Sequence, residues 1–321
     1  MRVVYFGMLG AFSRAPLAAL LNAGIDVRGV VIPARGAAAL SPGPSPVEDR
    51  RGERALARIA PEPPRSQAPV AGPYLGPNIV HIAWQRGIPV FEARHLDHPD
   101  TLAAIAGLRP DVACVACFSK RIPVALLALP EHGFLNVHPS LLPAYRGPEP
   151  LFWAFRNGEA SNGVTVHFMD EGLDTGGLVA QARIEFPDGV SGAEAERLCA
   201  ESGGRLLVDV IRALHLTTDG AERNLGRPQP EGGSYYPAPA PGDFALSLDW
   251  PARRAFNFMR GTAEWNRPYT VEVNGERLAL QKALSYSATQ TLDQSPAVIG
   301  DEAWIQFSSG VLRARALRIE A

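Results

Sequence analysis

The sequence predicts an α/β protein with two domains, an N-terminal domain on a parallel sheet and a smaller, mostly β C-terminal domain. RVVYFG, APLAALLNAG and VRGVVIP have the patterns of a buried strand, a helix and a second strand, which together form a βαβ unit. The same alternation continues to about residue 216. After a polar stretch rich in Pro and Gly, residues 241–321 show mainly strand patterns.

Composition and charge narrow the range of possible functions. The 321 residues exceed one average domain, and 46% of them are hydrophobic, which is enough for a sizeable core. A net charge of -2 excludes an overall basic, nucleic-acid-coating protein, although a local basic patch stays possible. No apolar run approaches the ~20 residues that span a bilayer, and no cleavage site follows MRVVYFG, so we expect neither a membrane segment nor a signal peptide. Three cysteines without framework spacing predict a reducing, cytoplasmic location.

We predict the elements of the first domain from the spacing of the hydrophobic residues and from the residues typical of helix ends. Gly24 stands where a helix C-terminal glycine belongs, and Asp100 is expected to cap a helix. Ser191 and Glu194 predict a capping box at the start of a long helix that runs to residue 216. The other helix patterns are NIVHIAWQRG, PDTLAAIAGL, VALLAL and PEPLFWAFRNG, and the other strand patterns are IPVFEA, DVACVACF, GFLNVH, GVTVHFMD and LVAQARIEF, the last two as a hairpin-like pair.

Two stretches interrupt this order. Residues 34–77 are rich in Pro, Ala and Gly and predict a long inserted loop, either functional or disordered; its arginines stand near acids, which favours a solvated loop over a phosphate site. Residues 217–240 predict a linker. The predicted domains are therefore 1–216, with the insertion, and 241–321, which contains an Asn274-Gly275 hairpin turn.

The segment FLNVHP places two polar side chains at a strand end. Residues i and i+2 of a strand point the same way, so Asn136 and His138 project together, and Pro139 ends the strand. Ligands of parallel α/β sheets bind beyond the carboxyl ends of the strands. A site is therefore predicted at this edge.

The segment MDEGLDTGG supplies a carboxylate. Its glycines permit sharp turns, and Asp174 lies in the middle of the loop. An aspartate beside a histidine stabilises the charged imidazole, and an asparagine donates to an oxyanion. Because no Ser or Cys nucleophile accompanies them, Asn136, His138 and Asp174 predict transfer to an external nucleophile.

These motifs also carry a family resemblance. N-V-H-P-S-L-L-P, Y-R-G and M-D-E-G-L-D-T-G resemble the 10-formyltetrahydrofolate-dependent formyltransferase family, most closely its methionyl-tRNA formyltransferase members. The resemblance extends over nearly the whole chain and implies a Rossmann-like formyltransferase domain followed by an OB-like β domain. It implies that Asn136 holds the formyl oxygen, that His138 moves protons, and that Asp174 orients His138 or a water.

The resemblance further implies 10-formyltetrahydrofolate as the formyl donor and no metal. Ser140 is implied as a supporting residue behind the three catalytic ones. The implied folate contacts are Phe118, Arg121, Ile122, Asp170, Glu171, Gly172 and Leu173, with the spacing around Arg121 departing from the family pattern.

Two other motifs favour structural roles. Cys114 and Cys117 form a C-x-x-C inside a predicted buried strand, so we expect both in the core, not in a metal or redox site. GMLGAFS has only part of a dinucleotide-binding fingerprint, so NAD binding is not favoured. The six histidines other than His138, including His167, are scattered along the chain, and we assign them no chemistry.

The acceptor stays open on sequence alone. Residues 241–321 carry nine basic and nine acidic residues, whereas a domain that binds a polyanion concentrates positive charge. The resemblance implies that family members acting on tRNA have a basic loop at the place where this chain has its Pro-rich insertion. The acceptor is therefore either methionyl-tRNA or a small amine, such as an amino sugar or amino-acid derivative. Hydrolysis of the formyl-folate, or binding without catalysis, would also fit the sequence, and no protein partner is predicted.

Overall fold

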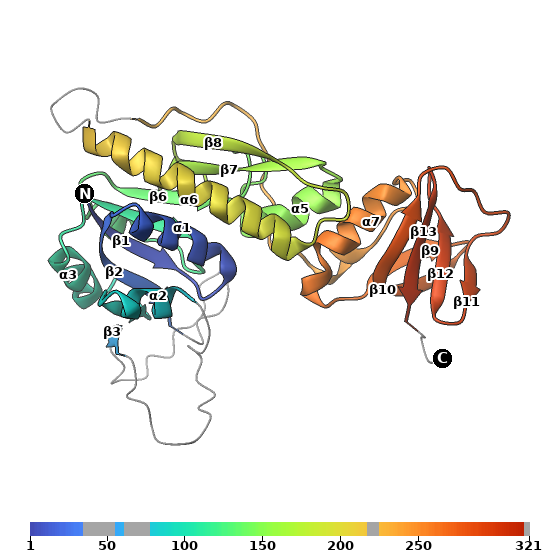
Figure 1. Cartoon of the computed structure of the whole chain (residues 1–321), viewed down its shortest axis with the longest axis horizontal. Helices are drawn as coiled ribbons and strands as arrows, with labels where there is room; N and C mark the ends of the chain where they lie inside the picture. Colours follow the sequence, from blue (N-terminus) through green and yellow to red (C-terminus); the bar gives the residue numbers. More distant parts are fainter. Residues whose placement is uncertain (35–54, 61–77, 217–224, 318–321) are drawn as a thin grey trace, which may run out of the picture. The chain divides into compact units, whose positions relative to one another are not determined.

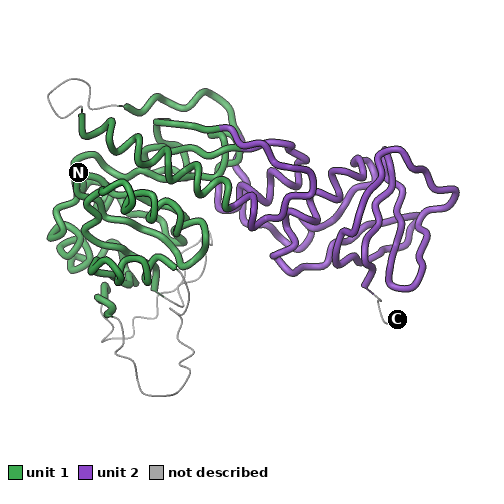
Figure 2. Tube along the Cα trace, viewed as in Figure 1, with its two compact units in different colours: residues 1–146, 163–182, 197–233 green, residues 147–162, 183–196, 234–321 purple. Residues whose placement is uncertain are grey.

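The computed structural model describes residues 1–34, 55–60, 78–216 and 225–317 (Figure 1). The chain forms two compact units that are not contiguous in sequence (Figure 2). Unit 1 comprises residues 1–146, 163–182 and 197–233, and unit 2 comprises residues 147–162, 183–196 and 234–321. The predicted boundaries at 216 and 241 stay a prediction.

The first sheet has eight strands in the order β3-β4-β2-β1-β5-β6-β7-β8. Its centre is parallel, and β3 and β7 pair antiparallel to β4 and β6. With helices around it, this sheet confirms the predicted Rossmann-like class. The strands are β1 (Arg2–Gly7), β2 (Asp26–Pro33), β3 (Leu56–Ile59), β4 (Val90–Ala93), β5 (Val112–Ala116), β6 (Phe134–His138), β7 (Ser161–Phe168) and β8 (Leu178–Glu185).

The helices fall close to the predicted patterns, with two local differences. α1 begins at Ala11, earlier than its apolar period indicates. Asp100 does not cap α3, because Pro99 takes the first helical position and the His98 Nδ1 accepts the Asp100 N–H at 3.2 Å. The helices are α1 (Ala11–Asn22), α2 (Ile79–Gln85), α3 (Pro99–Gly107), α4 (Val124–Leu127), α5 (Pro150–Asn157), α6 (Gly192–Leu216) and α7 (Ala252–Gly261). None of the helices in the described ranges has the length and apolar character needed to cross a bilayer.

A strand lies inside the stretch that the sequence predicts as one long loop. Leu56–Ile59 form β3, which pairs with Val90–Ala93 of β4 at the edge of the sheet. The Arg94 N–H also donates to the Ala55 carbonyl at 2.8 Å. The four residues Leu-Ala-Arg-Ile are too few to give a recognisable strand pattern among Pro- and Arg-rich neighbours. The segment is extended because it pairs with β4. Residues 35–54 and 61–77 of this stretch lie outside the described residues.

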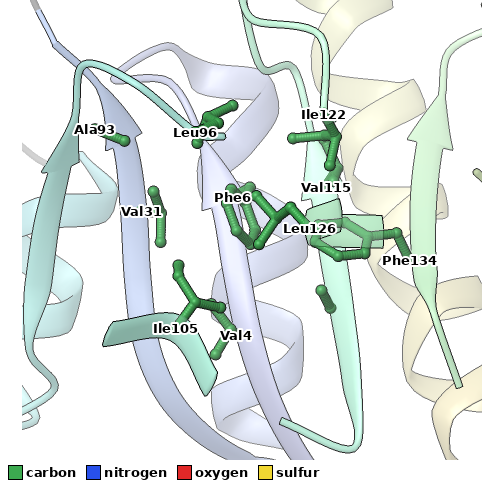
Figure 3. Close-up of a cluster of buried hydrophobic side chains, with 11 residues drawn as sticks. Val4, Phe6, Val31, Ala93, Leu96, Ile105, Val115, Ile122, Leu126 and Phe134 are labelled. Carbon is green, nitrogen blue, oxygen red and sulfur yellow. The ribbon is translucent and has the colours of Figure 1, made fainter. Parts of the chain in front are cut away.

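A buried apolar cluster on one face of the sheet supports the end of β6. Phe6 lies near its middle, and the ring centroids of Phe6 and Phe134 are 5.3 Å apart (Figure 3). The other members of the cluster are Val4, Val31, Ala93, Leu96, Ile105, Ala113, Val115, Ile122 and Leu126. Burial of each large side chain of this kind contributes about 1.5–3 kcal/mol. Phe134, Asn136 and His138 alternate along β6 and so share a face. The polar pair therefore begins where the apolar cluster ends.

Helix α6 packs closely against β6 and β7 at Gly203 and against α1 at Gly204. A Cβ on Gly203 would lie 2.4 Å from Val137 Cγ1 and 3.0 Å from Val164 Cγ2. A Cβ on Gly204 would meet Pro16 and Ala19 of α1 at 3.1 Å, in line with the course of α1 beside α6 in Figure 1. Val137 points away from the polar pair, so α6 supports β6 from the opposite face. The predicted start of α6 is confirmed, since the Ser191 hydroxyl accepts the Glu194 N–H at 3.2 Å.

The second sheet is antiparallel, in the order β11-β12-β13-β10-β9. Its strands are β9 (Tyr269–Val273), β10 (Glu276–Ser287), β11 (Ala297–Ile299), β12 (Glu302–Gln306) and β13 (Val311–Ala316). Asn274 and Gly275 have φ of 54° and 82°, as the predicted hairpin turn requires. Within unit 2, Phe152 of α5 packs edge-on against Phe244, Phe258 and Trp265, at centroid distances of 5.2, 5.4 and 5.4 Å. This residue is therefore part of a core.

We predict that Gly203→Ala lowers the free energy of unfolding by about 1–3 kcal/mol, because an added methyl overpacks a filled interface and Val137 is stiff at χ1. Urea denaturation measures the change. Gly107→Ala is the matched control: Gly107 ends α3 and a Cβ there meets nothing within 4 Å, so we expect no loss or a gain of up to about 1 kcal/mol. Equal losses in the two variants would contradict a close approach of α6 to the sheet.

Candidate active site

Strand β6 presents Asn136 and His138 together, as the sequence predicts. His138 is 4% exposed and Asn136 is half-buried. The turn after the strand is held from within, because the Ser140 hydroxyl donates to the Ala144 carbonyl at 2.7 Å and the Thr165 hydroxyl donates to the Ser140 carbonyl at 2.6 Å. Ser140 is thus fully buried with its hydroxyl committed to the turn, which fits a supporting role and not that of a nucleophile.

The geometry fixes the tautomer of His138. Its Nε2 lies 2.9 Å from the Tyr145 carbonyl oxygen, which can only accept, so Nε2 carries the proton in the neutral ring. The lone pair is therefore on Nδ1, 3.6 Å from Asp174 Oδ1. Burial lowers the pKa of His138, while the nearby charge of Asp174 opposes that shift. A neutral imidazole with its lone pair toward the carboxylate can act as a general base.

Asp174 reaches this position through a constrained loop. The Asp170 carboxylate accepts the Gly172 N–H at 3.0 Å and the Thr175 hydroxyl at 2.6 Å, and the Phe168 N–H donates to the Gly177 carbonyl at 2.9 Å across the base of the loop. Asp174 itself has φ 56°, a left-handed conformation that is uncommon for residues other than glycine. Its side chain is only 16% exposed, so its charge acts in a poorly screened environment.

His167 joins the three predicted residues, although the sequence predicts no chemistry for it. It pairs with Asn136 across β6 and β7, and its Nε2 lies 3.2 Å from Asn136 Nδ2 and 3.7 Å from Asp174 Oδ1. Its Nδ1 lies 2.7 Å from the Phe168 carbonyl oxygen, so Nδ1 carries the proton and Nε2 accepts from the Asn136 amide. A signal was present in the sequence: Thr165 and His167 are polar residues two apart in the run GVTVHF, whose other residues are Gly, Val and Phe.

One carboxylate oxygen therefore meets three side chains. Asp174 Oδ1 lies 3.4 Å from Asn136 Nδ2, besides its contacts with His138 and His167. The separation from Asn136 is long for a hydrogen bond, so an incoming oxygen can replace it. This arrangement offers a proton acceptor, an amide donor, and a carboxylate that stabilises a protonated imidazole.

The residues implied as folate contacts divide into two groups. Ile122 is 4% exposed and packs in the apolar cluster, and Phe118 packs edge-on against Phe6 at 5.5 Å. By contrast, Glu171 and Leu173 are exposed on the loop, and the Arg121 guanidinium donates to the Glu171 carbonyl. That bond brings the segment after β5 beside the 170–174 loop. Which of these residues touch a folate stays a prediction.

The two cysteines of the C-x-x-C differ in environment. Cys114 is buried in β5, and burial raises the pKa of its thiol well above the ordinary value. The expectation that Cys117 is a core residue is wrong, because β5 ends at Ala116 and the chain turns there, leaving Cys117 exposed at φ 55°. Within the ranges that the structure describes, no three His, Cys, Asp or Glu side chains are grouped as a metal site requires.

A hollow elsewhere in the molecule lacks comparable chemistry. It measures about 330 Å³, and its lining contains no carboxylate or imidazole; the lining residues are Met259, Arg260, Ala263, Gln281, Lys282, Ala283 and Arg315. That lining does not offer the combination of an imidazole and a carboxylate found at the end of β6.

The fold and the site define an α/β group-transfer protein with acid–base and amide groups but no covalent nucleophile among them. Residues 55–211 match the family model described as formyl transferase. The chain is 33% identical over 265 residues to a methionyl-tRNA formyltransferase of Pelotomaculum thermopropionicum, covering 83% of this chain and 73% of the relative. With the one from Geobacter metallireducens it shares 31% identity over 274 residues, covering 84% and 85%. The chain belongs to the formyl transferase family.

Other comparisons are partial or concern the fold alone. The match to a methionyl-tRNA formyltransferase of Thermodesulfovibrio yellowstonii, at 32% identity, covers 64% of this chain and 65% of that relative. The solved N-formyltransferase of Helicobacter canadensis, in complex with folinic acid and dTDP-3-aminofucose, has a TM-score of 0.61 at 14% identity, covering 98% and 99% of the two chains. HypX of Aquifex aeolicus with tetrahydrofolic acid has a TM-score of 0.56 at 16% identity, covering 98% of this chain and 43% of HypX. At such identities these structures support the fold.

The pKa shift of His138 predicts how stability depends on pH. Because the folded-state pKa is lowered, the unfolded chain takes up a proton below about pH 6.5 that the folded chain resists. The stability that neutral His138 provides is therefore present above about pH 6.5 and is lost as pH falls toward the folded pKa. We expect the unfolding free energy to drop less between pH 7 and pH 5 in His138→Gln than in the parent.

Urea denaturation measures these free energies of unfolding. The comparison is made in a Glu149→Gln background, because Glu149 also titrates in this pH range. Burial, with the charge of Glu196, raises the pKa of Glu149 from 4.5 to about 7, so its contribution is present below pH 4.5 and is lost as pH rises toward 7. That slope opposes the slope of His138 and would mask it. Identical pH slopes for Glu149→Gln with and without His138→Gln would contradict a buried, neutral His138.

Proposed function

We propose that this chain is a cytoplasmic enzyme of one-carbon metabolism that transfers a formyl group from 10-formyltetrahydrofolate to a primary amine. The observation that carries the proposal is the convergence of Asn136, His138 and Asp174, with the His138 lone pair on Nδ1. Membership of the formyl transferase family supports the same chemistry. A folate donor is consistent with the folate compounds bound in two structures of similar fold.

The donor supplies the formyl carbon, and the residues of this chain manage charge and protons around it. Asn136 donates from Nδ2 to the formyl oxygen as negative charge develops there, exchanging its long contact with Asp174 for a shorter one. His138 accepts at Nδ1 the proton that the amine nitrogen loses on forming its bond to the formyl carbon. Asp174, 3.6 Å away, stabilises the imidazolium.

The second half of the reaction returns this proton. As the bond from the formyl carbon to the folate nitrogen breaks, that nitrogen takes the electron pair and receives the proton from His138 Nδ1. His138 ends neutral, as it began, and Asp174 stays ionised throughout. The amine must enter as the free base, since an ammonium has no lone pair with which to attack.

Two acceptor classes follow from different observations. Methionyl-tRNA is the first candidate, because it is named in the activity of the relatives that match most of the chain. A small amine is the second, because nine basic and nine acidic residues leave 241–321 neutral, which does not favour a polyanion. The amino sugar named with the Helicobacter canadensis structure, an N-formyltransferase of similar fold, is consistent with the second class.

We expect His138→Gln and Asp174→Asn each to lower kcat by about 10²–10⁴-fold, because the first removes the proton acceptor and the second removes the charge that stabilises its protonated form. The double variant should lose little more than the single ones, since the two residues act as a unit. The absorbance of the released tetrahydrofolate measures turnover, and thermal melting checks the fold. A folded single variant that keeps a tenth of the parent turnover would refute the assigned roles.

An acceptor screen tests the reaction class. Formyl-folate is mixed with charged initiator tRNA, with nucleotide-linked amino sugars, with amino acids, or with no acceptor, and we expect tetrahydrofolate release only when an amine is present. For tRNA, log(kcat/KM) should fall with log[salt] by about 0.7–0.9 per phosphate contact, whereas a small amine should give a weaker dependence. Equal formate release without any amine would establish hydrolysis instead of transfer.

A further inference from the structure

The side chain of Gln229 joins the two loops that carry the catalytic groups. Its Nε2 donates to the Asp174 carbonyl at 2.7 Å and to the Gly176 carbonyl at 2.8 Å. Its Oε1 accepts from Arg146 Nε at 3.1 Å and Nη2 at 2.6 Å. Carbonyls only accept and a guanidinium only donates, so the amide has one possible orientation, and both its hydrogens and its oxygen are used.

Each joined segment contains a residue in the left-handed conformation. Asp174 has φ 56°, and Tyr145, which precedes Arg146, has φ 60°. Residues other than glycine hold this conformation only where surrounding contacts enforce it. The Tyr145 carbonyl accepts from His138 Nε2, and the Asp174 carboxylate faces His138 Nδ1. Gln229 therefore binds the backbone of Asp174, whose carboxylate faces His138, and the side chain of Arg146, which follows the Tyr145 carbonyl that accepts from His138.

The segment that carries Gln229 is itself anchored. Arg227 and Leu178 exchange both backbone hydrogen bonds, at 2.8 and 2.7 Å, which fixes the segment beside the start of β8. Farther along, Gly233 adopts φ 93° and passes so close to the Pro143 carbonyl that a Cβ would lie 2.3 Å from its oxygen. The segment is thus held on both sides of Gln229, which favours a fixed position for its amide.

We propose that Gln229 is a positioning residue, which holds the Tyr145–Arg146 turn and the Asp174–Gly176 loop at the spacing that proton transfer through His138 requires. This role rests on the proposed formyl transfer. Gln229 acts through backbone carbonyls and Arg146, so its loss changes where the imidazole and the carboxylate stand and not which groups are present. The effect therefore belongs to kcat more than to the KM of the formyl donor.

Two substitutions separate the bonds. Gln229→Glu keeps an acceptor for Arg146 but places a carboxylate oxygen against the Asp174 and Gly176 carbonyls, whereas Gln229→Met removes all four bonds at similar length. We expect kcat to fall at least 30-fold in both, with the KM of the donor changed less than threefold. The Gln229→Glu result separates the proposal from general destabilisation, because this variant keeps its contact with Arg146.

Gln306→Met is the matched control. Gln306 Nε2 donates to the Phe307 and Gly310 carbonyls, both at 3.0 Å, and its Oε1 accepts the Leu292 N–H at 2.9 Å, within the C-terminal sheet. We expect a drop in melting temperature similar to that of Gln229→Met, with kcat within twofold of the parent. A kcat within threefold of the parent in both Gln229 variants would overturn the positioning role.

Amide hydrogen exchange tests the same bonds without relying on activity. Exchange across residues 172–177 and 145–147 should speed up at least tenfold in Gln229→Met and stay unchanged in Gln306→Met. Unchanged exchange there in Gln229→Met would overturn the proposal whatever reaction the protein performs. A parent protein without formyl transfer, but with the faster exchange in Gln229→Met, would refute the proposed function and leave the structural connection intact.

Discussion

The buried carboxylate of Asp174 is the constraint on which the site depends. A charge with so little access to water needs donors, and three ring or amide nitrogens lie within 3.7 Å of Asp174 Oδ1: Asn136 Nδ2, which donates, and His138 Nδ1 and His167 Nε2, which can donate only when their rings are protonated. Two of these come from β6 and one from β7, and the cross-strand pairing of Asn136 with His167 places them side by side. The register of two strands thus sets the electrostatics of the site.

Two backbone carbonyls then settle the protons. The Tyr145 oxygen fixes a proton on His138 Nε2, and the Phe168 oxygen fixes one on His167 Nδ1, so both imidazoles turn a lone pair toward the shared polar centre. The His167 Nε2 lone pair accepts a hydrogen bond from the Asn136 amide, whereas the His138 Nδ1 lone pair faces Asp174. The two histidines beside this carboxylate are therefore not equivalent, because their ring nitrogens contact different partners.

The sequence predicts those parts of the fold and site that depend on local pattern. The i, i+2 placement of Asn136 and His138, the Ser191 cap and the Asn274-Gly275 turn each follow from a few adjacent residues. What the sequence does not predict depends on pairing between distant segments. His167 acquires its role from an antiparallel register with β6, β3 from an edge of β4, and Gln229 from two loops more than 50 residues away. Cys117 shows the opposite limit, since an apolar run continues through a point where the strand has already ended.

The burial of the site also bears on the choice between transfer and hydrolysis. A base that can deprotonate an amine adduct can also activate water, which is far more concentrated than any acceptor. Asn136, His138 and Asp174 alone therefore do not select between transfer and hydrolysis. The side chains of His138, Asp174 and His167 are 5%, 16% and 2% exposed, so they have little contact with bulk solvent. In the proposed reaction, low access of water strengthens the interaction of Asp174 with the imidazolium and disfavours water as a competing nucleophile. In that reaction the close packing around Asp174 favours both reactivity and selectivity, and we expect residues that maintain it to influence the outcome without touching the reacting atoms.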